Sequence, residues 1–560
     1  MRLGNERQGT VVKDLARKSA VPGAAWVSFG LVAVLFLGAY PILLSFFARM
    51  LGDPGDPRLT NLILENTYQA VVERSHGIWD ARIFYPTPNT AAYTELLLGS
   101  APIYWVLRLC GQASDTSYQL WILIVLALDY LAFYCWLTRC FGYTPLPSAV
   151  GAILFAAGAP RTGQNSHQQL FAQFFTIGAL YVLFRIFTVK SARDDGRRSG
   201  WIAAFVLLVV AQLYAGFYLG WFLCLTLLLA GIVTLGRAGL RSRALWIVGR
   251  NRRAIAVALI LGLATIGPLF VHYRSVVPEI GEVTFDDIEA GVPHLQSWLF
   301  LGQTSRLYGW MSRVSIWQRL AIPHEHSLGV GFVTTVVAIA GLYRNRGVPA
   351  VAIASATALL TIAITTASPR HLTAWPYFYR VLPGASAIRA LSRIGLVVLI
   401  VIALGVAGFL QSFMQSIGGT LLPAILVTGI ILEQTRSLPS YDKLLMRSKA
   451  QTIAAKLGGA RCSFFYFSPR LHKKMRDEDM IVMRVLWQLD AMQAAVLRGI
   501  PTVNGYSGHF PSGWEELAAN EIVVKADARR LRGALTGWLK THGLDPMDFC
   551  WVRMAGDYEY

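Results

Sequence analysis

The sequence predicts an all-α polytopic membrane protein with about eleven transmembrane helices, followed by a small C-terminal α/β soluble domain. Three observations predict this fold class. Hydrophobic residues make up 54% of the 560 residues and charged residues only 15%, which is more apolar than a soluble core requires. The apolar residues form long blocks, close to the ~20 residues that cross a bilayer as a helix. The last ~125 residues lose this pattern and indicate a soluble domain.

The net charge of +19 does not indicate a nucleic-acid partner. The chain has no zinc-finger spacing, no RNP-like motif and no basic stripe interleaved with aromatic residues. Its basic residues instead cluster in segments that the positive-inside rule assigns to the cytoplasm. These segments are the N-terminal tail (residues 1–25, with Arg2, Arg7, Lys13, Arg17 and Lys18), a short loop (Lys190, Arg193, Arg197 and Arg198) and residues 237–253 (Arg237, Arg241, Arg243, Arg250, Arg252 and Arg253).

The basic segments set the topology of a transmembrane domain at residues 26–434, with the N-terminus in the cytoplasm. Its predicted spans are 26–48, 119–138, 145–160, 168–189, two helices within 201–235, then 254–272, 329–343, 348–366, 394–412 and 419–434. The loops 49–118, 273–328 and 367–392 and the domain 435–560 then lie in the periplasm. This topology requires residues 95–109 to form a helix on the membrane surface, although the segment is apolar enough that it could also cross the membrane.

The domain 435–560 alternates short apolar strands, such as RCSFFYF and FCWV, with amphipathic helical patterns, which indicates a small α/β unit. Cys462 and Cys550 fall in these two strands, and they either form a disulfide or remain free. The loop NGYSGHFPSGW, residues 504–514, either covers a sugar or only connects two elements.

The first outside loop begins with LGDPGDPRLTNLILEN, residues 51–66, directly after a membrane-length apolar run. Asp56 is the favoured catalytic candidate, because it follows a span closely and Pro57 restrains the backbone beside it. Asp53 is the second candidate, and the alternative interpretation is a turn with two solvated aspartates. Glu65 in the helix that follows and Glu95 further along the loop are candidates for acceptor contact.

The outside turn APRTGQNSHQQLFAQ, residues 159–173, carries Arg161 and His167. A cation at the outer ends of two helices can bind a phosphate, assisted by the N-terminus of the helix beginning near Gln168. The alternative for Arg161 is a side chain that extends to the membrane surface without binding a ligand. His167 is a candidate for acceptor contact.

Two further outside segments carry candidates. In RLAIPHEHSLGVGF the residues His324, Glu325 and His326 precede a span, and they contact the acceptor or act as an auxiliary acid or base. A metal site there is the less favoured alternative, because no third ligand is adjacent. YFYRVLPGASAIRALSRIG carries Arg380, Arg389 and Arg393, three guanidinium groups of the kind that a lipid-linked phosphate needs. Arg389 and Arg393 are four residues apart and are expected to share a helix face.

Within the membrane, Asp129 lies near the middle of a predicted span, WILIVLALDYLAFYCWL. An ionisable residue at that depth is a candidate for proton coupling in a transporter. A buried polar contact is the alternative that we favour, because no lysine or arginine stands on a matching span.

Together these segments resemble the GT-C class of membrane glycosyltransferases. In that class the first outside loop follows the first span, carries the catalytic aspartate and continues into helices along the membrane, here LGDPGDPRLTNLILEN and then IFYPTPNTAAYTELLLGSAPIYW. GDPRLTNLILEN, HEHSLGVGF, PGASAIRALSRIGL and NGYSGHFPSGW are similar to a group of bacterial inner-membrane proteins assigned to that class. Many members carry adjacent acidic residues, whereas Pro54 and Gly55 separate the two aspartates here, which leaves the choice between them open.

The resemblance implies transfer of a sugar from a polyprenyl-phosphate donor to a glycan, lipid or protein acceptor at the membrane surface, with inversion by direct displacement. Asp56 would act as the general base, and arginines would neutralise the leaving phosphate, Arg389 and Arg393 first and then Arg161. A divalent cation, Mg²⁺ or Mn²⁺, remains open as a cofactor. The alternatives from other classes are a transporter or flippase, which would show charges in several spans and repeated halves, and a non-catalytic membrane scaffold.

Overall fold

The computed structural model describes residues 23–188, 195–280, 284–368, 372–416, 421–459, 462–472 and 475–555. The expected cytoplasmic tail, residues 1–25, lies outside the described residues apart from its last three, as do Lys190 and Arg193. Strands are few, and helices make up most of the described chain. The fold class is the predicted one.

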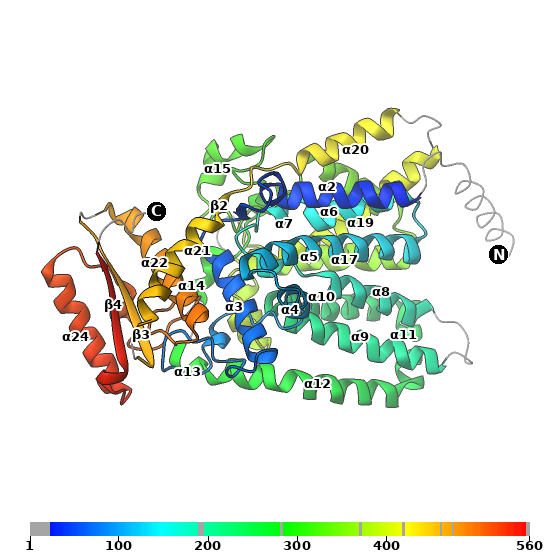
Figure 1. Ribbon diagram of the computed structural model, residues 1–560. Helices are drawn as coiled ribbons and strands as arrows, with labels where there is room; N and C mark the ends of the chain where they lie inside the picture. Colours follow the sequence, from blue (N-terminus) through cyan, green and yellow to red (C-terminus); the bar gives the residue numbers. More distant parts are fainter. Residues whose placement is uncertain are drawn as a thin grey trace.

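A bundle of apolar helices forms the membrane domain (Figure 1). Within the described ranges, eight helices are long and apolar enough to cross a membrane, and seven of them belong to this bundle. The seven are α2 (Gly23–Leu44), α5 (Ser114–Trp136), α8 (Phe174–Thr188, which the preceding turn lengthens to the apolar stretch Gln168–Thr188), α9 (Asp195–Ala215), α10 (Phe217–Leu235), α12 (Arg252–Ser275) and α19 (Gly395–Ser416). Four shorter helices occupy the remaining predicted span positions, namely α6 (Pro145–Ala157), α16 (Phe332–Arg344), α17 (Pro349–Thr365) and α20 (Leu421–Glu433). The protein is therefore a multi-pass membrane protein.

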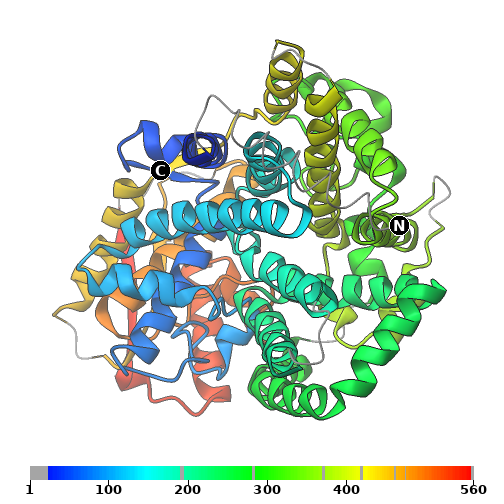
Figure 2. The ribbon, with the colours of Figure 1, turned by 90° about the vertical axis from the view of Figure 1, so that its right-hand side faces the viewer.

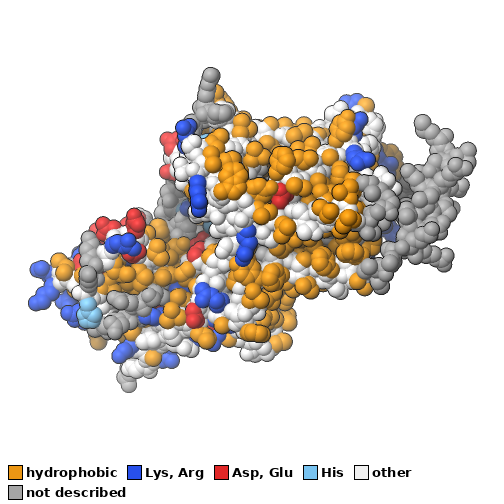
Figure 3. All heavy atoms as spheres, turned by 90° about the horizontal axis from the view of Figure 1, so that it is seen from above, with side chains coloured by type: hydrophobic (Ala, Val, Ile, Leu, Met, Phe, Trp, Pro, Cys, Tyr) orange, Lys and Arg blue, Asp and Glu red, His pale blue; other side chains and the backbone are white. Residues whose placement is uncertain are grey.

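The surface of the bundle is apolar. Figure 3 shows one face on which hydrophobic side chains cover the bundle, while charged side chains are more frequent toward the C-terminal domain. Val32 on α2 and Leu263 on α12 are 68% and 69% exposed. Exposure of this extent over a helical bundle suits contact with lipid, where the helices satisfy their own backbone hydrogen bonds.

One segment differs from the sequence predictions in its secondary structure, and a second forms a shorter helix than predicted. The basic segment 237–253, expected as a loop, contains the helix α11 (Ala238–Arg250), because arginine, alanine and leucine are good helix formers. The predicted surface helix 95–109 is α4 (Ala101–Leu109), whose nine residues are too few to cross a bilayer. This segment does not span, as the topology requires.

Short helices and loops cover one end of the bundle. They include α3 (Asp56–Val71), α7 (Ala159–Thr162), α13 (Val277–Ile280), α14 (Phe285–Ile288), α15 (Ser315–Gln318) and α18 (Trp375–Val381). Single helical turns join them, namely η1 (Thr90–Tyr93), η3 (Gln168–Leu170), η5 (Glu289–Gly291), η6 (Leu295–Trp298), η7 (Gly309–Arg313), η8 (Ala385–Ala387) and η9 (Leu391–Ile394), while η2 (Leu137–Phe141) extends α5. The segments that carry the candidate residues therefore meet at this end.

The C-terminal domain is a small α/β unit. Its strands β3 (Phe464–Arg470) and β4 (Phe549–Ala555) pair in parallel, with Phe464 opposite Phe549. Single parallel bridges add Thr502 and Ile522 to β3. The helices α21 (Lys443–Leu457), α22 (Asp477–Arg498), α23 (Glu515–Ala518) and α24 (Lys525–Thr541) and the turn η10 (Pro546–Asp548) complete the unit. Although α22 is the eighth long apolar helix, it packs against α21 and β3, so its apolar face is used within this domain.

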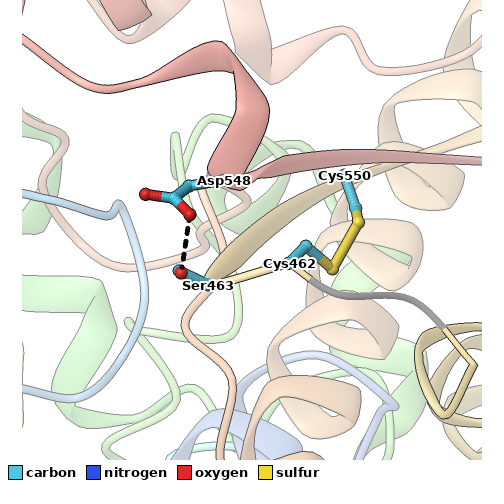
Figure 4. Close-up of a disulfide and its surroundings, with 4 residues drawn as sticks. All are labelled: Cys462, Ser463, Asp548 and Cys550. Atoms are coloured by element: carbon cyan, nitrogen blue, oxygen red, sulfur yellow. Dashed lines mark hydrogen bonds between the residues drawn. A yellow bond between two sulfur atoms is a disulfide. The ribbon is translucent and has the colours of Figure 1, made fainter.

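A disulfide joins Cys462 and Cys550, which precede β3 and stand in β4, with their Cα atoms 5.7 Å apart (Figure 4). Beside it Ser463 Oγ donates a hydrogen bond to Asp548 Oδ1 over 3.2 Å. The disulfide alternative for these two cysteines is therefore the correct one.

The C-terminal domain is fastened to the first loop of the membrane domain. The strand β1 (Arg49–Leu51) pairs antiparallel with β2 (Ser440–Asp442). One hydrophobic cluster combines Leu59 and Ile63 of α3 with Tyr466 and Met492 of the C-terminal domain. In Figure 2 the blue first loop and the orange and red C-terminal elements overlap on one side of the bundle, in agreement with these contacts. The end of the first span and the last quarter of the chain thus share one core.

Candidate active site

Asp56 is the first residue of α3 and stands at the end of the bundle. The preceding Asp53 is exposed, and its Oδ1 accepts a hydrogen bond from the Gly55 backbone N–H over 2.8 Å. This closes a turn of the kind that Asp favours. Pro57 in the first turn suits a helix start, and a negative charge there is stabilised by the helix dipole. The DPGDP segment therefore uses Asp53 for the turn and directs Asp56 into the helix end.

Two side chains hold the Asp56 carboxylate from opposite parts of the sequence. Tyr506 Oη donates a hydrogen bond to Oδ1 over 2.7 Å, and His167 Nε2 lies 3.2 Å from Oδ2. Burial raises the pKa of Asp56, and the hydrogen bond from Tyr506 opposes that rise. A carboxylate with a raised pKa binds an abstracted proton more firmly than an exposed aspartate does.

His167 connects Asp56 to a second acidic group. Its Nε2 lies 3.9 Å from Glu325 Oε1, and Arg393 Nη2 pairs with the same oxygen over 2.6 Å. Burial lowers the pKa of His167 to about 3, with a further contribution from the Arg393 charge, so its imidazole is neutral at neutral pH. Burial alone would raise the pKa of Glu325, but the charge of Arg393 lowers it to about 2. The contacts around His167 therefore bring together two carboxylates, Asp56 and Glu325, and the guanidinium of Arg393.

Arg389 and Arg393 approach from the segment before α19. Arg393 belongs to the turn η9 and Arg389 precedes that turn, so the expected shared helix face is wrong. Tyr218 supports both residues. Its hydroxyl accepts a hydrogen bond from the Arg389 backbone N–H over 3.0 Å, and the Arg393 guanidinium lies 5.0 Å from its ring centre. Arg389 Nη1 also donates to the Gly508 carbonyl over 2.7 Å.

These groups surround a cavity of about 200 Å³. Its polar lining combines Asp56, His167, Arg389, Arg393 and Glu95 with uncharged donors and acceptors. The complete lining is Asp56, Leu59, Thr60, Ile63, Thr94, Glu95, Leu97, His167, Gln169, Arg389, Arg393, Tyr506, Ser507 and Gly508. Two carboxylates and two guanidinium groups thus face one space at the end of the bundle, an arrangement that can deprotonate a hydroxyl and neutralise an anion.

Glu95 occupies a further part of the cavity wall. Its Oε1 accepts a hydrogen bond from the Tyr218 backbone N–H over 2.9 Å, at the start of α10. Burial raises the pKa of Glu95 to about 7, although this hydrogen bond and the Arg393 charge favour the ionised form. The structure therefore brings the predicted residues Asp56, Glu95, His167, Arg389 and Arg393 together, with Glu325 next to them.

Arg161 lies apart from the cavity. Its side chain is fully buried, forms an ion pair with Asp129 and donates hydrogen bonds to the backbone carbonyls of Phe155 and Phe171. Gln173 accepts a further hydrogen bond from it. These contacts make Arg161 the partner of Asp129 inside the bundle end, in place of the predicted phosphate contact. Asp129 has the buried polar contact that the sequence analysis favoured.

Glu65 and His326 are bound within the fold. Glu65 is buried, accepts a hydrogen bond from Tyr104 Oη over 2.6 Å and pairs with Arg108 over 2.8 Å, which fixes α3 against α4. His326 is buried between Ser297 Oγ and the Ala290 carbonyl, each 2.9 Å from a ring nitrogen. Neither residue lines the cavity, so the structure gives them packing contacts in place of the predicted acceptor contact.

His324 and Arg380 are exposed. The ring of His324 stacks on that of His167, with centroids 6.2 Å apart, so it lies near the site. Arg380 stands on α18 and does not line the cavity.

The described residues do not fit a divalent cation. In the part of the chain that the structure describes, no group of three His, Cys, Asp or Glu side chains has the arrangement of a metal site. The His324–Glu325–His326 segment directs its side chains to different partners, and Glu325 is engaged by Arg393.

The sequence analysis missed Tyr506 and Tyr218 as site residues. The loop 504–514, which contains Tyr506, was noted for its glycines and aromatic residues, and three of its residues, Tyr506, Ser507 and Gly508, line the cavity. Whether this loop covers a sugar stays a prediction. Tyr218 gave no signal, because an aromatic residue at a helix end is common in membrane proteins.

Comparison with known proteins finds similar solved structures. No protein-family model matches the chain, and no curated protein matches it in sequence. The apo oligosaccharyltransferase of Archaeoglobus fulgidus is 12% identical with a TM-score of 0.49, over 86% of this chain and 64% of that chain. The same enzyme tethered to an acceptor peptide containing the NVT sequon is 10% identical with a TM-score of 0.48, over 87% of this chain and 64% of that chain. ArnT from Cupriavidus metallidurans bound to undecaprenyl phosphate is 13% identical with a TM-score of 0.40, over 85% of this chain and 71% of that chain.

These neighbours are glycosyltransferases of the GT-C class that the sequence resembles. The chain spans about two thirds of the length of the structures it matches. At such identities and TM-scores the likeness concerns the outline of the fold, and it does not carry the activity of those enzymes to this chain.

Proposed function

We propose that this protein is a membrane glycosyltransferase that moves a sugar from a polyprenyl-phosphate donor to a glycan, lipid or protein acceptor. The observation that carries the proposal is one cavity that holds the Asp56 carboxylate together with the Arg389 and Arg393 guanidinium groups. The cavity lies where apolar helices end. A substrate with a phosphate head and a hydrocarbon tail can therefore present its phosphate there while its tail remains in lipid.

The proposed reaction is a single displacement. Asp56 takes the proton from an acceptor hydroxyl, and the oxygen forms a bond to the anomeric carbon as the bond to the phosphate oxygen breaks. The polyprenyl phosphate leaves with the bonding electron pair, and Arg389 and Arg393 stabilise its charge. The anomeric centre is inverted, and the proton ends on Asp56.

His167 and Glu325 would support this chemistry without forming bonds to substrate. A neutral His167 beside Asp56 adds no charge to the base, and it can donate a hydrogen bond to the carboxylate. Glu325 holds Arg393 through a close ion pair, which fixes the guanidinium toward the cavity. We propose Glu95 and His324 as groups that contact the acceptor or the sugar.

We also propose that the site faces the periplasm of a bacterial inner membrane, with the N-terminus in the cytoplasm. The basic segment 237–253 lies at the opposite end of α12 from the site, where the positive-inside rule expects it. The disulfide of the C-terminal domain, on the same side as the cavity, is of a kind that persists in an oxidising compartment.

A transporter is less well supported. The main sequence feature in favour of a transporter was a single charged residue within a span, Asp129, and in the structure Asp129 forms an ion pair with Arg161. A buried pair of this kind is held by packing and does not need a transported proton to explain it.

The test compares wild type with Asp56→Asn and Asp53→Asn in membranes, following transfer of sugar from radiolabelled polyprenyl-phosphate donors to endogenous acceptors. Loss of a general base lowers a rate by ~10²–10⁴-fold. We expect that loss for Asp56→Asn, whereas Asp53→Asn should retain most activity, because the Asn side-chain oxygen can still accept the turn hydrogen bond from Gly55 and residue 53 lies outside the cavity lining.

Both variants must be present at wild-type amounts and elute as folded protein for the comparison to count. Full activity of Asp56→Asn would remove the base assignment. An inactive wild type across a broad panel of donors would contradict the transferase proposal itself.

A further inference from the structure

The C-terminal domain supplies a side chain to the cavity through the loop Tyr506–Gly508. Tyr506, Ser507 and Gly508 line the cavity, although the rest of its wall comes from loops of the membrane domain. Tyr506 Oη donates its hydrogen bond to Asp56, and the Gly508 carbonyl accepts one from Arg389. A single short loop therefore contacts both the proposed base and a proposed phosphate ligand.

The start of this loop is anchored inside the C-terminal domain. Asn504 is buried, and its Nδ2 donates to Gln488 Oε1 over 2.8 Å. The Gly505 backbone N–H donates to the same oxygen over 3.1 Å. The Tyr506 backbone N–H points to Met492 Sδ at 3.1 Å. Because Gln488 and Met492 both belong to α22, that helix fixes the backbone from which the Tyr506 side chain extends.

The far side of the loop is tied to the membrane domain. Ser507 Oγ donates to the Tyr93 carbonyl over 3.0 Å. An added Cβ on Gly505 would lie 2.1 Å from the Phe84 ring, so the backbone here packs directly on the first loop. Contacts on both sides leave the Tyr506 hydroxyl with little freedom to move away from Asp56.

Asp56 is surrounded by several other charged or titratable groups. Asp53 from its own turn and Glu325 repel its charge, while Arg393 attracts it, and His167 is neutral. The Tyr506 hydroxyl is the donor to Oδ1, and hydrogen bonding to the ionised form favours that form.

We infer that Tyr506 is a positioning residue that orients the Asp56 carboxylate and keeps it ionised, so that the C-terminal domain completes the catalytic site. The inference rests on the proposed function for its meaning in catalysis, but the ionisation of Asp56 can be measured without activity.

The test follows the titration of Asp56 by chemical labelling. A carbodiimide activates protonated carboxyl groups, and an added amine converts them to stable amides, so the pH at which Asp56 ceases to react reports its pKa. The Asp56 side chain is 29% exposed and faces the cavity, which gives a small reagent access. Peptide mass spectrometry would follow Asp56 in wild type, in Tyr506→Phe and in Asp115→Asn.

Asp115→Asn is the matched control. Asp115 pairs with Arg447 and so also joins the membrane domain to the C-terminal domain, but it lies outside the cavity lining. Removing a hydrogen bond to an ionised carboxylate should raise its titration midpoint by about one pH unit. We expect that shift in Tyr506→Phe and none in Asp115→Asn. An unchanged midpoint in Tyr506→Phe would overturn the inference.

The activity profile gives a second readout. If the wild type transfers sugar, the acid limb of its pH–rate profile should move upward in Tyr506→Phe by the same amount as the labelling midpoint. A uniform loss of rate at every pH, with no displacement of the limb, would overturn the part of the inference that Tyr506 keeps Asp56 ionised. If the wild type shows no transfer, the transferase proposal fails and the labelling result alone decides the inference.

Folding is checked by elution of the purified protein. Tyr506→Phe removes one oxygen and keeps the ring. If it does not fold, Tyr506→Met, a flexible side chain without a donor, takes its place with the same expected shift.

Discussion

Arg161 Nη1 lies 3.1 Å from Asp129 Oδ2, and both side chains are at most 1% exposed. Asp129 comes from the span α5 and Arg161 from the turn after α6, so the pair joins two parts of the bundle at depth. Asp129 Oδ1 also accepts a hydrogen bond from the Gln173 backbone N–H over 3.1 Å. Each charge is thus compensated by the other and by its surroundings.

We predict that Asp129→Asn destabilises the protein by about 3–5 kcal/mol, because it leaves the Arg161 charge buried without its partner. The measurement is the thermal unfolding midpoint in detergent. Asp479→Asn is a suitable control, since it breaks an ion pair with Arg476, and the Arg476 and Asp479 side chains are 81% and 43% exposed. That partly exposed pair should contribute at most about 1 kcal/mol. Equal losses in the two variants would contradict the prediction.

The contribution of Glu325 to the stability of the folded protein should depend on pH. Burial opposes its ionisation, but the charge of Arg393 lowers its pKa to about 2, below the ordinary value of 4.5. The folded state therefore favours the ionised form, and this stabilisation is present above pH 4.5 and is lost as the pH falls toward 2. Glu325→Gln should be less stable than wild type at pH 7, on the order of 3 kcal/mol, with the difference closing as the pH falls through this window.

The measurement is a series of thermal unfolding midpoints of both proteins between pH 7 and the lowest pH that the detergent tolerates. A difference that stays constant with pH would count against the assignment of the ionised form to Glu325.

The contribution of Glu95 to stability should change with pH in the opposite direction to that of Glu325. Burial raises its pKa from 4.5 to about 7, so the folded state binds the proton more firmly than the unfolded state does. Stability is then lost as the pH rises from 4.5 through 7. Glu95→Gln, which stays neutral, should gain in thermal midpoint relative to wild type at pH 8 and show a smaller difference at pH 5.

Glu73→Gln is the control for that experiment. Glu73 is an exposed carboxylate of the same loop, so its replacement reports the effect of removing a loop carboxylate that is not buried. A pH-independent effect of Glu95→Gln would show that the Glu95 carboxyl is not held in the protonated form by burial.

Gly508 should be sensitive to the smallest side chain. An added Cβ would lie 2.4 Å from Arg389 Nη2, so Gly508→Ala must displace the end of that side chain. If Arg389 binds the donor phosphate, the KM for the donor should rise by about tenfold, the cost of roughly one weakened hydrogen bond to a charged group. Gly537→Ala on α24 is the matched control, because its added Cβ meets no atom within 4 Å. An equal KM in the two variants would place Arg389 outside the donor site.

The transmembrane architecture could be predicted because lipid imposes a simple requirement. A spanning segment must satisfy its own backbone hydrogen bonds, so apolar length alone indicates a helix. The secondary structure of the segment 237–253 could not be predicted in this way. The positive-inside rule assigned its side of the membrane from Arg237 and Arg253, but that rule says nothing about whether a basic segment is helical.

The candidate site could be predicted in part for a related reason. The sequence predicted that four site residues lie in loops on one side of the membrane, namely Asp56, His167, Arg389 and Arg393. Loops at one end of a helical bundle lie close together, so these residues were expected to be neighbours. Arg161 was expected there too, but its pairing with Asp129 joins a span to a turn, and no local pattern encodes such a contact. The contact of Tyr506 with Asp56 joins residues 450 positions apart, which composition and periodicity do not reveal.

The pairing of β1 with β2 also bears on how the protein is made. The strands join positions separated by 391 residues, since Arg49 hydrogen-bonds to Ser440. A ribosome that adds ~5–20 residues per second needs on the order of tens of seconds to cover that distance. During this time the strand after the first span has no partner, while the remaining helices enter the bilayer. Asp56 stands only five residues beyond that strand, so its surroundings are completed at the end of synthesis, when the last part of the chain has been delivered.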